Sequence, residues 1–157
     1  MAIRTKAVPR AEIFDLRRSV LRPGLPADAA VYPEDADPGV FHMAAYDGDT
    51  LAACATFFPD PVPGEEAVPA YRFRGMASSP EARGRGFGAA VLRAGIQEAA
   101  RRGAELVWCN GRVSARGFYE RMGFTTDGAT FEIVPSGAHH RFVFKISADP
   151  ADVGGPP

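Results

Sequence analysis

Alternation of hydrophobic and polar residues indicates strands near the beginning of the chain and again in its middle. Residues 3–8 alternate weakly, and residues 70–77 alternate clearly between aromatic and basic positions. Residues 41–46 and 51–58 are apolar runs separated by an Asp-Gly-Asp turn, which is the pattern of an antiparallel hairpin. We therefore expect a short strand, a hairpin and a further strand before residue 78.

Apolar residues at helical spacing predict helices at three places. After Pro9, such residues continue as far as Leu21. Residues 86–102 carry the clearest amphipathic pattern, and their two terminal arginines and the glycine that follows suit the C-terminal end of a helix. A third, short helix is expected to start at Ser114, as its N-cap, and to run through Met122.

The remaining segments complete an alternating order of strands and helices. We expect a buried strand at 104–109 and two final strands at 131–134 and 141–146. Residues 23–40 hold four prolines and four acids but no lysine or arginine, and are expected to form a long loop. The order β-α-β-β-β-α-β-α-β-β predicts an α/β fold with a mixed sheet.

Composition agrees with a globular domain and adds few constraints. The chain has 157 residues, of which 46% are hydrophobic and 24% are charged, and its formal net charge is −1. We expect residues 1–147 to form a single domain and residues 148–157 to form a disordered tail. The net charge gives no reason to expect nucleic acid as a partner.

The two cysteines, Cys54 and Cys109, each lie in an apolar run and lack the spacing of a zinc site. We expect both to be reduced core residues of a cytoplasmic protein that needs no metal. No apolar run approaches the about 18 residues of a membrane span, and the N-terminus lacks the apolar stretch of a signal peptide. We therefore expect no membrane partner.

A glycine-rich segment joins the strand at 70–77 to the clearest helix. Glycine occupies every second position from Gly84 to Gly88, which lets the backbone come close to a ligand. Its N–H groups are expected to point out of the helix N-terminus, where the helix dipole favours anions. Arg83 and Arg85 add charge that suits phosphate. The alternative is a flexible turn with two solvated arginines.

The glycine spacing fits the common nucleotide-binding loops poorly. A P-loop needs Gly-Lys-Ser/Thr, whereas Ala89 follows Gly88 here. The dinucleotide-binding pattern can be placed on Gly84, Gly86 and Ala89, but about six residues separate it from the strand that it should follow directly. The acid that would bind ribose should close the next strand, whereas Glu105 opens that strand. We therefore disfavour a dinucleotide-binding domain.

Two motifs resemble the signatures of the GNAT-type N-acetyltransferases. The spacing Arg83-x-x-Gly86-x-Gly88 looks like the family's Q/R-x-x-G-x-G/A signature, and residues 74–80 (RGMASSP) resemble the strand and bulge before it. Residues 115–124 (ARGFYERMGF) resemble the second motif, A-x-x-F-Y-x-x-x-G-F. The motifs stand in family order and spacing, and the deduced element order matches that fold over most of the chain.

The resemblance implies a GNAT-like acyl-CoA N-acyltransferase fold. Its mixed, mostly antiparallel sheet would be flanked by helices and splayed between the strands at 70–77 and 104–109 to admit the cofactor. Acetyl-CoA would be the acyl donor, as a cosubstrate. A primary amine of a small molecule or peptide would attack it directly within a ternary complex. The exposed strand edges expected in this fold are compatible with a homodimer.

The resemblance also implies which residues bind CoA. The pantetheine would pair with the backbone near Met76 and Ser78, and an amide near Met76–Ala77 would stabilise the oxyanion of the thioester. The diphosphate would lie on the amides from Arg85 to Ala89. The residues expected to bind the cofactor are Met76, Ala77, Ser78, Arg83, Gly84, Arg85, Gly86, Phe87, Gly88 and Ala89.

The tyrosine of the second motif, Tyr119, is the expected general acid. The resemblance implies that its hydroxyl protonates the departing thiolate, and a phenol with a pKa of about 10 is protonated at neutral pH. The alternative is that Tyr119 only packs beside Phe118. The general base that deprotonates the amine is not assigned to one residue. Glu132 in the next strand is one candidate. His140, with His139 beside it, is the other, because histidine is the natural base near neutral pH. Each of these also suits a surface position.

Two further features bear on the acceptor and on the contacts of the second motif. The loop at 23–40 is expected to border the acceptor pocket, where four carboxylates would attract a cationic amine, although a solvated loop is the alternative. Arg112 stands where the family often has asparagine, seven residues before the tyrosine, so no contact of that asparagine is carried over. Because no base is assigned, a non-catalytic acyl-CoA-binding or regulatory module on the same fold is the competing function.

Overall fold

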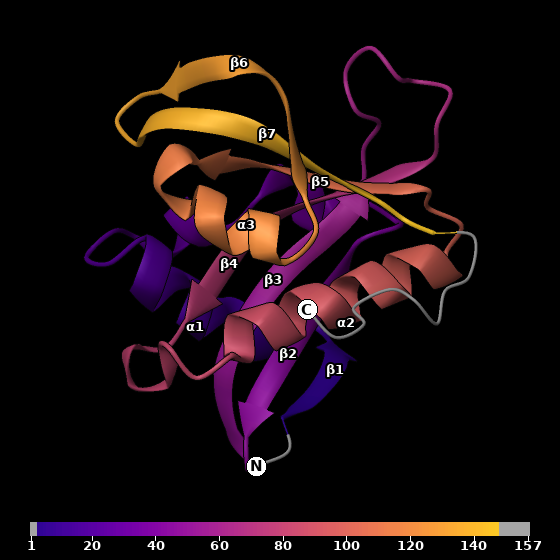
Figure 1. The fold of residues 1–157 in the computed structure, drawn as a ribbon. Helices are drawn as coiled ribbons and strands as arrows, with labels where there is room; N and C mark the ends of the chain where they lie inside the picture. The colour runs from indigo at the N-terminus through magenta and orange to yellow at the C-terminus, as the bar shows by residue number, and fades with distance from the viewer. Residues whose placement is uncertain (1–2, 148–157) are drawn as a thin grey trace. The chain divides into compact units, whose positions relative to one another are not determined.

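The computed structural model describes residues 3–147 (Figure 1). Contacts divide the chain into two units. Unit 1 comprises residues 1–59 and 73–95, and unit 2 comprises residues 60–72 and 96–157. Strand β4 and helix α2 each contribute residues to both units. The expectation of a single domain stays a prediction.

Unit 1 contains an antiparallel arrangement of strands. β1 (Arg4–Val8) pairs with β2 (Phe41–Asp47), and β2 pairs with β3 (Thr50–Pro59) across the predicted turn, where Gly48 has a φ of +61°. The second half of β4 (Ala70–Ser78) follows β3 in the strand order. These strands confirm the predicted ones to within about two residues at each end.

Two helices of unit 1 also agree with the prediction. α1 (Arg10–Leu21) begins directly after Pro9, and α2 (Phe87–Arg101) contributes its first nine residues, 87–95, to the unit. Ile13 of α1 is fully buried in a cluster of apolar side chains from β1, β2, β3 and β4. The apolar stripe read from the sequence is therefore the face that α1 buries.

Residues 23–40, here called the acid-rich segment, are more ordered than the predicted loop. They contain two turns of 3-10 helix, η1 (Ala27–Ala30) and η2 (Pro33–Ala36). Proline fits the first position of such a turn because its missing N–H has no helical partner there. The backbone N–H of Tyr32 donates to the Asp35 carboxylate at 2.9 Å, which closes the start of η2.

Aromatic packing joins α2 to the strands of unit 1. The ring of Phe57 on β3 stacks on Phe41 with centroids 4.9 Å apart, and lies 5.4 Å from the ring of Phe73. A Cβ at Gly95 of α2 would come within 2.0 Å of the Phe57 ring. Only glycine lets the helix backbone approach the ring this closely, so Gly95 sets how α2 packs on β3.

Unit 2 contains both parallel and antiparallel strand pairs. The first residues of β4 pair in parallel with β5 (Leu106–Arg112), from Ala70 opposite Leu106 to Arg72 opposite Trp108. β5 pairs antiparallel with β7 (Gly137–Lys145), and β7 pairs antiparallel with β6 (Thr125–Ile133). This combination confirms the predicted mixed α/β class.

Three strands of unit 2 differ from the prediction in extent. β7 begins at Gly137, four residues before the expected start at Arg141, because residues 137–140 already pair with β5 or β6. β5 begins two residues later than expected and runs to Arg112, because the three residues after Cys109 continue to pair with β7. β6 begins at Thr125 instead of Phe131. Its residues are almost all exposed, so no apolar alternation marks its first half.

The short helix after β5 starts later than the sequence predicts. A 3-10 turn, η4 (Val113–Ala115), comes first, and α3 (Arg116–Arg121) follows with no side chain capping its N-terminus. The prediction of Ser114 as N-cap is therefore wrong, because the 3-10 turn takes up the residues where the cap was expected. The helix ends at Arg121, one residue earlier than expected, and Gly123 has the predicted left-handed conformation after it, with a φ of +96°.

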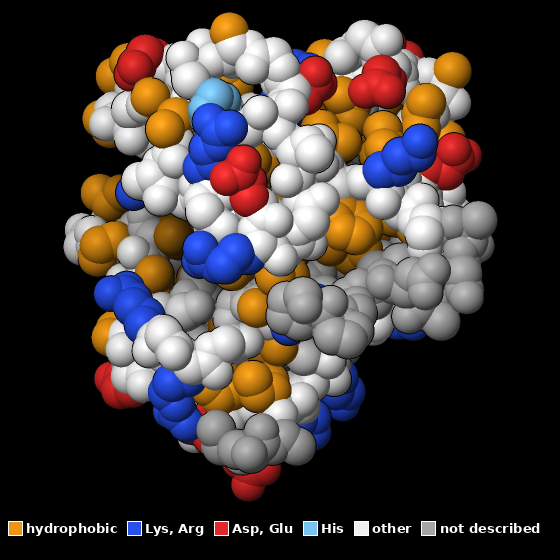
Figure 2. Space-filling model, in the orientation of Figure 1, with side chains coloured by type: hydrophobic (Ala, Val, Ile, Leu, Met, Phe, Trp, Pro, Cys, Tyr) orange, Lys and Arg blue, Asp and Glu red, His pale blue; other side chains and the backbone are white. Residues whose placement is uncertain are grey.

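In the part of the chain that the structure describes, the helices give no sign of a membrane span, and the face drawn in Figure 2 gives no sign of a strongly charged surface. Among the described residues, no helix is both long and apolar enough to cross a membrane. Basic, acidic and hydrophobic side chains are interspersed on the face drawn in Figure 2, which agrees with the small net charge. The expected tail at 148–157 lies outside the described residues.

Candidate functional site

The glycine-rich segment has the backbone that the sequence predicts. Gly84 and Gly86 have φ values of +77° and +88°, a conformation that other residues rarely adopt. Among residues 3–147, a Cβ at Gly84 would meet no atom within 4 Å, and a Cβ at Gly86 would meet only Ile3, at 3.9 Å. The backbone conformation therefore requires glycine at both positions. Among residues 3–147, it also leaves space beside the backbone of this segment.

Helix α2 begins directly after this segment, and its first backbone amides have no acceptor within the helix itself. The amide of Ala90 donates to the Gly86 carbonyl at 3.0 Å, which is the first turn of the helix. The amides of Phe87, Gly88 and Ala89 precede that bond, and amides at this position have no acceptor within their own helix. The positive end of the helix dipole lies at the same place, so an anion would be stabilised there.

The two arginines of the segment differ in their surroundings. Arg85 forms an ion pair with Asp47 of β2 at 3.0 Å, and its guanidinium lies 5.2 Å from the centre of the Phe87 ring. Arg83 is exposed. Asp47 offsets part of the charge of Arg85, so this guanidinium would attract an anion less strongly than an unpaired one.

The end of β4 lies beside the start of α2. Gly75 has a φ of +68°, which kinks the strand one residue before Met76. Ser78 approaches Gly88, since its Oγ would lie 3.6 Å from a Cβ there. All ten residues that we expected to bind the cofactor belong to unit 1, on β4, on α2 or between them.

Buried charge fixes the acid-rich segment within unit 1. Arg17 of α1 is fully buried and donates to both carboxylate oxygens of Asp35, at 2.8 and 3.0 Å, and to the Ala30 carbonyl at 3.0 Å. Burial alone would raise the pKa of Asp35. The hydrogen bonds from Arg17 and the Tyr32 amide, together with the Arg17 charge, outweigh that effect and hold this pKa below its ordinary value.

The carboxylates expected to attract a cationic amine are partly engaged with arginines. Asp35 pairs with Arg17, and Glu34 accepts a hydrogen bond from Arg74 of β4 at 2.8 Å. The attraction expected from four free carboxylates is therefore reduced. Arg17 is a structural residue that our sequence reasoning missed, and an arginine within the apolar stripe of α1 is the signal that marks it.

In unit 2, Tyr119 lies in an aromatic pocket. Its ring is 4.6 Å from that of Phe142 and 5.2 Å from that of Phe118, and a Cβ at Gly111 would come within 2.7 Å of it. Its hydroxyl forms a hydrogen bond with the Cys109 thiol. Burial, reinforced by Cys109, raises the pKa of Tyr119 above its ordinary value, and burial raises the pKa of Cys109 to about 12.

The candidate bases occupy different surroundings on the β6–β7 hairpin. His140 lies opposite Gly111, and its ring is 5.7 Å from that of Phe142, so it shares two neighbours with Tyr119. Within residues 3–147, its Nδ1 is buried without a hydrogen-bond partner. Glu132 is exposed. His139 points to the other face of the sheet, where its Nδ1 lies 2.7 Å from the Gly137 carbonyl oxygen.

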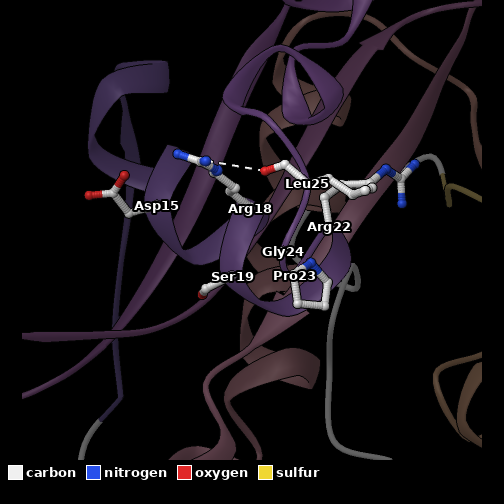
Figure 3. A pocket seen from close by; sticks show the side chains of 7 residues that line it. All are labelled: Asp15, Arg18, Ser19, Arg22, Pro23, Gly24 and Leu25. Atoms are coloured by element: carbon white, nitrogen blue, oxygen red, sulfur yellow. Dashed lines mark hydrogen bonds between the residues drawn. The ribbon is translucent and has the colours of Figure 1, made fainter.

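Two pockets contain none of the predicted site residues. In unit 1, a pocket of about 490 Å³ is lined by residues from Asp15 to Leu25, where Arg18 donates to the Leu25 carbonyl at 3.1 Å (Figure 3). In unit 2, a pocket of about 730 Å³ lies near the end of α2 and the end of β7. Both cysteines are free and buried, as predicted.

Comparison with known proteins assigns the family. The profile of the family described as Acetyltransferase (GNAT) family matches residues 10–124. YitI of Bacillus subtilis strain 168, named as an uncharacterized N-acetyltransferase, is 30% identical over 137 residues, which covers 87% of this chain and 92% of that protein.

Solved structures agree with this assignment. An acyl-CoA N-acyltransferase from Pseudomonas aeruginosa has a TM-score of 0.71 at 18% identity, covering 91% of this chain and 99% of its own. A chain of the NatC complex bound to Gag peptide and CoA has a TM-score of 0.72 at 17% identity, covering 94% and 100%. The structures show the same fold and, together with the profile and YitI, lead to one conclusion: the chain belongs to the GNAT acetyltransferase family.

Proposed function

We propose that the protein is an N-acetyltransferase that transfers an acetyl group from acetyl-CoA to a primary amine of a small molecule or peptide. Family membership supports acyl transfer as the class of reaction. The observation that carries the proposal is the start of α2, where positive φ values at Gly84 and Gly86 precede three amides that the helix does not use.

The residues of unit 1 suit the parts of CoA that they are proposed to bind. The diphosphate lies on the amides from Arg85 to Ala89, where glycine leaves the backbone uncovered. The pantetheine pairs with β4 near Met76 and Ser78, as an added strand would. An amide near Met76–Ala77 faces the thioester oxygen and stabilises the oxyanion that forms when the amine attacks.

The proposed reaction is a direct attack within a ternary complex of protein, acetyl-CoA and amine. The amine nitrogen forms a bond to the acetyl carbon, the carbon–sulfur bond breaks, and its electron pair goes to sulfur. Tyr119 gives its proton to that sulfur, so that CoA leaves as a thiol, and a base takes the proton that the amine loses. The raised pKa of Tyr119 keeps the phenol protonated before this step.

We assign the base to His140 in preference to Glu132. His140 shares Gly111 and Phe142 as neighbours with Tyr119, and its buried Nδ1 has no partner among residues 3–147. The unprotonated nitrogen of a neutral histidine can act as a general base in such a step. Glu132 is exposed, so water competes for its carboxylate.

Thiol release from acetyl-CoA tests the proposal. The protein is incubated with acetyl-CoA and, in turn, with a polyamine, an amino acid and a peptide with a free N-terminus. We expect at least one amine to raise thiol release well above the amine-free rate. Binding of acetyl-CoA without turnover on any amine would favour the non-catalytic acyl-CoA-binding module, in which the Tyr119 hydroxyl stays bonded to Cys109.

A further inference from the structure

The ring of Tyr32 lies directly on the backbone of β4 at its kink. A Cβ at Gly75 would be 2.8 Å from the ring carbon Cε2 and 3.1 Å from the Tyr32 hydroxyl oxygen. The positive φ of Gly75 and the absence of a side chain therefore both serve this contact. Tyr32 fills the space beside β4 one residue before Met76, the position proposed to face the thioester.

Two guanidinium groups hold this ring in place. The guanidinium carbon of Arg17 lies 4.1 Å from the ring centre, and that of Arg74 lies 3.9 Å from it. Each arginine is itself fixed by a carboxylate of the acid-rich segment, Arg17 by Asp35 and Arg74 by Glu34. Tyr32 is 5% exposed. Moving the Tyr32 ring would break two cation–π contacts beside a buried ion pair, so the ring is held in one position against β4.

We propose that Tyr32 is a specificity-determining residue that limits the acyl group of the donor to a short chain. This inference rests on the proposed function, because it needs the thioester to lie at Met76. An acyl chain that extends past the carbonyl toward Gly75 meets the Tyr32 ring, whereas an acetyl group ends before it. The Arg17–Tyr32–Arg74 stack prevents the ring from turning aside for a longer chain.

The test compares acetyl-, butyryl- and hexanoyl-CoA, both in binding measured by calorimetry without amine and in thiol release with the best amine. The variants are Tyr32→Leu, which removes the ring, and Tyr32→Phe, which keeps it. Tyr46→Leu is the matched control, because Tyr46 is also a buried tyrosine of unit 1 with a guanidinium, that of Arg4, 4.3 Å from its ring centre.

We expect the wild-type protein to use acetyl-CoA at least tenfold more efficiently, in kcat/KM, than hexanoyl-CoA. Tyr32→Leu should reduce that ratio at least fivefold, and Tyr32→Phe and Tyr46→Leu should leave it unchanged. Equal kcat/KM values of the wild type for acetyl- and hexanoyl-CoA would overturn the inference, and this result does not depend on whether the Tyr32→Leu variant folds. A folded Tyr32→Leu variant with an unchanged ratio of these values would overturn it too. A wild type that binds no CoA compound instead contradicts the proposed function, and this inference with it.

Discussion

In unit 1, the residues proposed to bind acetyl-CoA lie on backbone shaped by glycines and next to a buried ion pair, whereas in unit 2 Tyr119 is held by aromatic rings, a glycine and a thiol. The first arrangement depends on backbone conformation and charge. The second depends on apolar packing. The two regions should therefore respond differently to loss of charge, to pH and to removal of a single polar atom.

The largest effect is expected from removing the buried arginine. Arg17→Met leaves the buried Asp35 carboxylate with only the Tyr32 amide and the more distant Arg10, 4.0 Å away, among the contacts of the described residues, and the free energy of unfolding should fall by about 3–5 kcal/mol. Urea unfolding measures this loss. Arg116→Met is the control, because its ion pair with Glu120 is half exposed and should change the stability by less than about 0.5 kcal/mol. Similar losses in both variants would show that burial of the charge is irrelevant.

The second effect concerns a single oxygen in unit 2. Tyr119→Phe keeps the ring against Phe142 and Gly111 but removes the proton proposed for the thiolate. We expect kcat to fall at least about tenfold, or about 1.4 kcal/mol in activation free energy, while the affinity for acetyl-CoA is nearly unchanged. Steady-state kinetics and calorimetry measure the two quantities. Unchanged turnover would remove the catalytic role of Tyr119.

The third effect is a pH dependence confined to unit 1. Thr56 Oγ1 accepts a hydrogen bond from Arg17 and lies 2.8 Å from Nδ1 of the buried His42. Burial lowers the pKa of His42 below 6.5, and the charges of Arg17 and Arg10 lower it further against the opposing effect of Asp35. Protonation of His42 is therefore unfavourable in the folded protein.

The sign of this dependence follows from linkage. The stability that neutral His42 contributes is fully present above pH 6.5 and is lost as the pH falls toward its lowered folded pKa, with a slope of at most about 1.4 kcal/mol per pH unit. Urea unfolding between pH 8 and 5 should show this loss in the wild type and a flatter profile in His42→Gln. Equal slopes would rule out His42 as the origin. Tyr119 and Cys109, whose pKa values are raised, do not titrate in this range.

The smallest effect is expected at the exposed pair beside the glycine-rich segment. Asp47→Asn releases Arg85 from its ion pair, so the guanidinium can add its charge to the proposed diphosphate site. The affinity for acetyl-CoA should rise about two- to fivefold, which corresponds to the about 0.5–1 kcal/mol of an exposed pair. Calorimetry at low and high salt measures it, and a weaker affinity would mean that Asp47 itself supports binding.

Local sequence pattern was sufficient to predict the structure where the conformation depends on residues that are close together in the sequence. Positive φ at Gly84 and Gly86 and the apolar stripe of α2 follow from residues within one segment, so the sequence predicted this region well. The tail of the second motif, with Gly123 in the left-handed conformation after α3, was predicted for the same reason.

Contacts between residues far apart in the sequence could not be predicted from local sequence pattern. The Arg17–Asp35 pair spans eighteen residues, and the contact of Tyr32 with Gly75 spans more than forty. The charge of Arg17 and the aromatic ring of Tyr32 do not indicate which distant residue each of them contacts. β6 was underestimated because its exposed residues carry no apolar alternation. The roles of Tyr119 and His140 stay predictions, since they depend on where a substrate binds.

The central claim is that the amides at the start of α2 bind the diphosphate of CoA, and calorimetry with acetyl-CoA tests it most directly. The wild type should bind, and Gly86→Ala, which strains a φ of +88°, should lose at least tenfold in affinity. Gly103→Ala introduces the same strain at a φ of +93° outside the segment and should bind as the wild type does. A folded wild-type protein that gives no heat of binding with millimolar acetyl-CoA would contradict the account.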